Sequence, residues 1–72
     1  MLTVEGTVQN VQIGLGAWSL VTEQGDTYEI YQPPTQLLQP GLNVKVQGQI
    51  RDDVMTVAMI GPVLEVLSFE II

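Results

Sequence analysis

Few residues of this chain have types and spacing that suit reactive chemistry. Gly14-Leu15-Gly16 contains a Gly-x-Gly pair, which in a dinucleotide-binding loop is followed by a third glycine and by a helix whose N-terminus receives the pyrophosphate. Here Ser19 stands where the third glycine is needed, and Ala17 to Thr22 alternates like a strand. The pattern therefore favours a turn between two strands over a phosphate site.

The side chains of familiar catalytic groups are missing or misplaced. The chain has no His and no Cys, so triads and dyads built on an imidazole or a thiolate are excluded. Asp52 and Asp53 are adjacent and point apart, whereas glycosidase carboxylates face each other at about 5–9.5 Å. The pair also lacks the six to eight oxygen ligands of a Ca²⁺ loop. We expect a turn at Asp52-Asp53, no catalytic residue, no metal and no cofactor, and therefore no enzyme.

Composition limits the class of partner. The chain has 72 residues and a net charge of −6, with eight acidic residues against Lys45 and Arg51. We expect one domain over residues 1–72, and the 46% hydrophobic content excludes disorder. The negative charge repels phosphate, so nucleic acid is an unfavourable partner. No signal-peptide pattern and no membrane-length apolar run occurs, which predicts a cytoplasmic protein that does not enter a membrane.

Alternating apolar residues predict three strands in the first half of the chain. The first runs from Leu2 to Ile13, and a change of parity after Gln9-Asn10 predicts a β-bulge near Asn10. Ala17–Thr22 and Thr27–Gln32 are the second and third strands, joined by a tight turn at Gln24-Gly25-Asp26. A long, bent first strand is typical of small barrels, in which it belongs to both sheets.

The second half predicts a helical turn and further strands. Pro33 to Gly41 has room for one helical turn, with Leu37 and Leu38 as its apolar plug. Leu42–Arg51 shows the cleanest alternation and predicts a fourth strand, and Val54–Ile60 is interpreted as a fifth. Val63–Ile72 is predicted to continue in extended form, with a helix starting at Pro62 as the alternative.

This order of elements resembles the OB-fold, a five-stranded Greek-key barrel. The stretch LLQPGLNVKVQGQIRDD looks like the passage into the fourth strand of such domains, although SH3-like barrels share this motif. The chain is also similar to small uncharacterised bacterial OB-like proteins. The resemblance implies an all-β fold: a five-stranded OB-like barrel, with a one-turn helix between strands three and four and a C-terminal strand extension.

The resemblance also implies a ligand face, because OB domains bind ligands across strands two and three. That face would offer Ser19, Thr27, Glu29 and Tyr31, and Trp18 is a further candidate for stacking. Stacking aromatics suit neutral oligosaccharides and, less well, single-stranded nucleic acid. The competing interpretation of Trp18 is a core residue that alternates with Leu20. In a third hypothesis the acidic residues Glu23, Asp26 and Glu29 dock on a basic partner.

The C-terminal region is the most apolar part of the chain. Thirteen of the nineteen residues from Val54 to Ile72 are hydrophobic, and Val54–Ile60 is apolar at both parities. A sheet buries one face, so a segment that is apolar on both sides needs cover. This predicts a non-catalytic module for protein binding, most simply a homo-oligomer, unless the segment folds back over its own sheet. The predicted interface residues are Met55, Val57, Met59, Leu67, Phe69 and Ile71.

Overall fold

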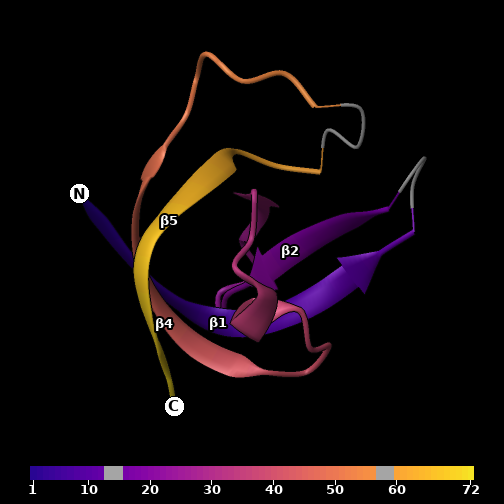
Figure 1. The fold of residues 1–72 in the computed structure, drawn as a ribbon, viewed down its shortest axis with the longest axis vertical. Helices are drawn as coiled ribbons and strands as arrows, with labels where there is room; N and C mark the ends of the chain where they lie inside the picture. Colours follow the sequence, from indigo (N-terminus) through magenta and orange to yellow (C-terminus); the bar gives the residue numbers. More distant parts are fainter. Residues whose placement is uncertain (13–15, 57–59) are drawn as a thin grey trace.

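Five strands form the protein, and the computed structural model describes residues 1–12, 16–56 and 60–72. The strands are β1 (Leu2–Val11), β2 (Ala17–Val21), β3 (Thr27–Tyr31), β4 (Asn43–Ile50) and β5 (Val63–Ile71), with a 3-10 turn, η1 (Thr35–Leu37), between β3 and β4 (Figure 1). The sheet closes into a ring in the order β1-β2-β3-β5-β4, and β4 pairs back with β1. The fold is therefore all-β, as predicted.

The ring is closed unevenly. Neighbouring strands are antiparallel except β3 and β5, which are parallel and share three residue pairs, whereas β4 and β5 share seven.

Among the described residues no helix is long and apolar enough to cross a membrane.

β1 pairs with two neighbours in succession. Leu2–Thr7 pairs with β4, and Thr7–Val11 pairs with β2. Gly6 lies next to this change of partner, where a Cβ would stand 2.5 Å from the Val21 carbonyl oxygen. Glycine therefore lets the two backbones approach. The predicted long strand shared by both parts of the sheet is confirmed.

The bulge predicted near Asn10 is wrong. The register between β1 and β2 is continuous there, with Asn10 opposite Trp18. Gln9 and Asn10 are both exposed, because this end of the hairpin extends away from the core (Figure 1). The observed register shift lies between β4 and β5, where Leu67 is the extra residue.

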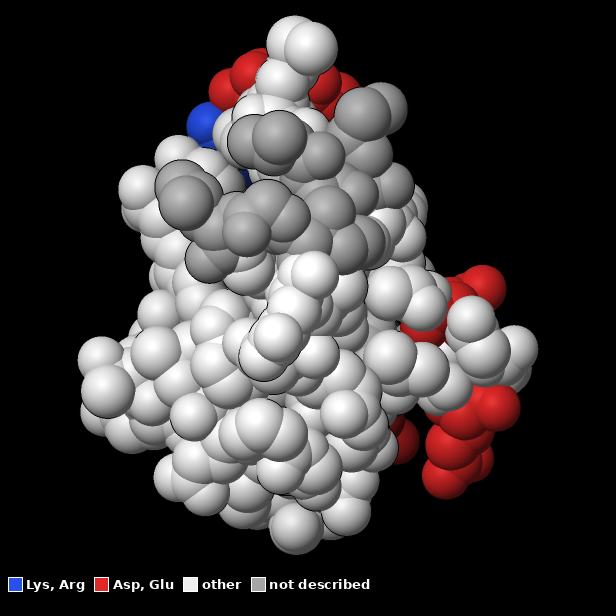
Figure 2. All heavy atoms as spheres, turned by 90° about the vertical axis from the view of Figure 1, so that its right-hand side faces the viewer, with Lys and Arg blue, Asp and Glu red and all other residues white. Residues whose placement is uncertain are grey.

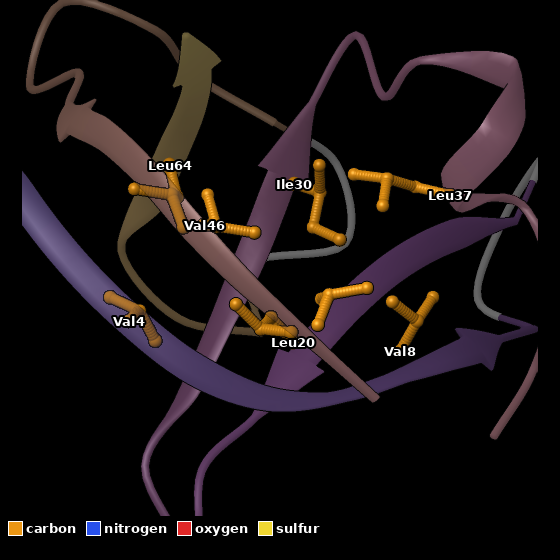
Figure 3. Close-up of a cluster of buried hydrophobic side chains, with 8 residues drawn as sticks. Val4, Val8, Leu20, Ile30, Leu37, Val46 and Leu64 are labelled. Carbon is orange, nitrogen blue, oxygen red and sulfur yellow. The ribbon is translucent and has the colours of Figure 1, made fainter. Parts of the chain in front are cut away.

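Eight buried side chains form the core, and they come from all five strands and η1 (Figure 3). Leu37 of η1 is fully buried and confirms the predicted plug, whereas Leu38 is exposed. Trp18, Tyr28 and Phe69 pack against the margin of the cluster. The cluster consists of Val4, Val8, Leu20, Ile30, Leu37, Val44, Val46 and Leu64.

The fifth strand is not the predicted one. Val54–Thr56 and Ile60 lie outside any strand, and the remaining residues of the predicted strand, 57–59, lie outside the described residues. The Arg51 N–H donates to the Val63 carbonyl at 2.9 Å, so β5 occupies the edge of β4 that Val54–Ile60 would have used. Val63–Ile71 is extended, which confirms the strand interpretation of this segment and makes it a member of the ring instead of an extension.

The predicted turns are confirmed where the structure describes them. Gly25 has a φ of 91°, and its N–H donates to the Thr22 carbonyl at 3.0 Å. Gly16 has a φ of 94° and precedes a strand, so no helix opens at the glycine pair. Gly14 and Leu15 lie outside the described residues.

Replacing Gly6 by alanine is expected to destabilise the fold by about 1–3 kcal/mol, because the new methyl group would overlap the Val21 carbonyl. Urea unfolding followed by tryptophan fluorescence measures the change. The control is Thr3→Ala, at an exposed position of the same strand. Equal stability of the two variants would contradict the role of Gly6 in closing the ring.

Candidate functional site

The outer face of β2 and β3, where OB domains bind ligands, is covered by the chain itself. Ser19, Glu29 and Val63 lie side by side on β2, β3 and β5, on the face opposite the core, yet all three are buried. Thr56 Oγ1 donates to Glu29 Oε1 at 2.6 Å. A ligand laid across the middle of this face would have to displace that contact.

The segment between β4 and β5 returns to the sheet beside the same face. The Glu29 N–H donates to the Pro62 carbonyl at 2.9 Å. A Cβ on Gly61 would overlap the Thr27 carbonyl oxygen, so Gly61 also lies close against β3. Ser19 Oγ donates to the Gln9 carbonyl at 3.5 Å. Three of the predicted ligand residues, Ser19, Thr27 and Glu29, are thus in contact with the protein's own chain.

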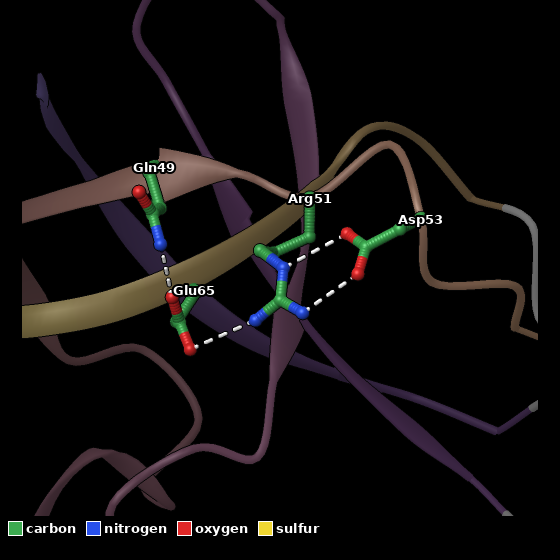
Figure 4. A network of polar contacts seen from close by, with 4 residues as sticks. All are labelled: Gln49, Arg51, Asp53 and Glu65. Atoms are coloured by element: carbon green, nitrogen blue, oxygen red, sulfur yellow. Dashed lines mark hydrogen bonds and ion pairs between the residues drawn. The ribbon is translucent and has the colours of Figure 1, made fainter.

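Tyr31 lies beneath the guanidinium of Arg51, at 5.6 Å from Cζ to the ring centroid. Arg51 Nε and Nη2 donate to both carboxylate oxygens of Asp53 at 2.9 and 2.8 Å, and Nη1 donates to Glu65 Oε2 at 3.1 Å (Figure 4). Gln49 Nε2 donates to the other oxygen of Glu65. The predicted turn at Asp52-Asp53 is confirmed, and Asp53 serves as a partner of Arg51.

The structure does not bring the predicted ligand residues together. Trp18 packs against the core, on the opposite face of the sheet from Ser19. Ser19 and Glu29 are buried near Thr56, and Tyr31 is stacked under Arg51. These residues do not form one open stacking surface.

A hollow of about 880 Å³ lies between the first half of β1 and the end of the β2–β3 hairpin. The side chains of Glu5, Glu23 and Asp26 contribute carboxylates to its lining, and Tyr28 contributes an aromatic ring. The described residues that line it include no Lys or Arg, so its charge disfavours phosphate. Of the acidic residues proposed to dock on a basic partner, Glu23 and Asp26 lie here and Glu29 does not.

Both cationic residues stand next to acidic ones. Arg51 is bound to two carboxylates, and Lys45 is in register with Glu5 on β1 and with Glu70 on β5. On the face in Figure 2 the centre carries no described charged side chain, and the visible blue atoms lie beside red ones at its edge. A positive groove that follows a nucleic-acid backbone is therefore not found on the described surface.

The second half of β5 has a strand on only one side. β3 pairs with β5 only over Val63–Glu65, because β3 ends at Tyr31 and is followed by Pro33-Pro34, which cannot donate to a ladder. Beyond that point β5 continues along β4 alone. Among the described residues no other strand pairs with its free side. We call Val66–Ile72 the free edge.

The free edge carries exposed apolar side chains. Leu67, Ile71 and Ile72 are 52%, 55% and 69% exposed, while Phe69 between them packs partly on the core. The bulge thus separates Leu67 from Phe69, which the alternation had placed on one face. Val63 and Leu64 are buried, so β5 is buried within the molecule at its start, while Leu67 and Ile71 near its end are exposed.

The remaining predicted interface residues belong to the segment between β4 and β5. Met55 is almost fully exposed there, and Val57 and Met59 lie outside the described residues. The described surface therefore retains two separate apolar features from the predicted set: Met55, and the free edge with Leu67 and Ile71.

Comparisons with known proteins assign no family. No protein-family model matches the chain, and neither a curated protein nor a solved structure matches it.

Within residues 1–12, 16–56 and 60–72 no group of three or more acidic side chains is placed to hold a metal ion.

Sequence reasoning missed three features of this surface. The Thr56–Glu29 contact joins residues far apart in the chain, and no local pattern signals it. The spacing Arg51-x-Asp53 across a turn is a signal that was available for the ion pair. The free edge follows from the unequal lengths of β3 and β5, which only the pairing reveals.

Arg51 is expected to control the titration of Asp53. The paired hydrogen bonds from Arg51 lower the pKa of Asp53 from 3.8 to about 2, and Asp53 in turn raises the pKa of Arg51. Because the folded-state pKa of Asp53 is depressed, its stabilising effect is present above pH 3.8 and is lost as the pH falls toward 2. In Arg51→Gln the pKa of Asp53 should return toward 3.8, as measured by NMR of the carboxyl carbon.

The control for this titration is Lys45→Gln, which removes the other cation and should leave the pKa of Asp53 at about 2. A wild-type midpoint near 3.8 would show that the ion pair does not persist in solution.

Thr56→Val is expected to destabilise the fold by about 1–3 kcal/mol, because it leaves an oxygen of the buried Glu29 carboxylate without its hydroxyl donor. Thr56→Ser is the matched control and should retain most of the stability. The midpoint of urea unfolding measures both variants. If the valine variant were as stable as the serine variant, the cover over the β2–β3 face would not depend on this contact.

Proposed function

We propose that this chain is a non-catalytic assembly module, an OB-like β-barrel that self-associates through the free edge of β5. The strand order β1-β2-β3-β5-β4, the parallel pairing of β3 with β5 and the bent β1 shared by two neighbours support an OB-like Greek-key barrel. The Leu37 plug between β3 and β4 also fits the one-turn helix that the resemblance implies.

One observation carries the proposed function: the free edge has exposed apolar side chains along a side of β5 with which no other described strand pairs. Unprotected edges of this kind are templates for pairing with another chain. Covering the exposed parts of Leu67, Ile71 and Ile72 would contribute about 1–2 kcal/mol each, or on the order of 3–6 kcal/mol per copy before the entropic cost of association. For a domain this small, that gain is comparable with its whole stability.

The alternative is a ligand-binding OB domain for neutral oligosaccharide or single-stranded nucleic acid, and the geometry supports it less well. On the face that would bind such a ligand, Glu29 is buried and bound to Thr56, while Gly61 and Pro62 contact the backbone of β3 at its edge. The hollow is open to a ligand, but the carboxylates in its lining disfavour a polyanion. A second copy of the chain, or a protein strand, is the partner that the free edge fits.

Wild-type protein is expected to elute as a particle of about twice the 7.9 kDa chain mass when size-exclusion chromatography with light scattering is run at micromolar concentration. Replacing Leu67 and Ile71 together by serine should shift the particle to the monomer, since it removes the apolar contact without adding charge. Leu38→Ser is the matched control, at an exposed leucine away from β5, and should leave the mass unchanged.

A wild-type particle that stays at 7.9 kDa across the micromolar range would refute self-association. A dimer that persists in the double serine variant would refute the involvement of the free edge. In that case the same experiment on Met55→Ser would assign the contact to the exposed methionine between β4 and β5.

A further inference from the structure

We draw no further inference here: the strongest candidate, the hollow between the first half of β1 and the end of the β2–β3 hairpin, owes its character to the exposed carboxylates of Glu5, Glu23 and Asp26, and no second feature among the described residues points to what would bind there.

Discussion

The structure depends on the double pairing of β1. β1 joins β4 to β2 in the ring, pairing with β4 over Leu2–Thr7 and with β2 over Thr7–Val11. The turn of the backbone there requires a residue without a side chain, because Gly6 lies against the carbonyl of Val21. With this bend in place, side chains from all five strands and from η1 converge on one small core.

Closure of the ring determines where the protein's surface is covered and where it is not. Thr56, which follows β4, donates to the buried Glu29 on the outer face of β2 and β3, and Ser19 beside Glu29 is buried as well. The opposite situation holds along β5, which is longer than β3 and pairs with it only at its start. The polar residues Ser19 and Glu29 on the outer face are thus buried, whereas Leu67 and Ile71 on the free edge are exposed.

Much of the fold could be predicted from the sequence, and the errors have physical causes. Alternation identified β1 to β4 because the side of each strand that faces the core is apolar, and Gly25 identified its turn because it has a positive φ. Val54–Ile60 was assigned to a strand because it is apolar, but Val54–Thr56 and Ile60 lie outside any strand, and apolar residues occur in connections as well. The positions of the predicted site residues could be predicted less well than the strands. Trp18 and Tyr31 belong to different faces, and the contacts that decide their surroundings join distant parts of the chain.

Pro33 and Pro34 have a consequence beyond ending a strand. They stop β3 at the level of Glu65, so they also determine how many residues of β5 have no neighbour inside the same molecule. A version of this chain whose third strand ran several residues further could pair with more of β5 and leave a shorter free edge. In this architecture the length of β3 therefore sets how much of β5 has a strand on only one side.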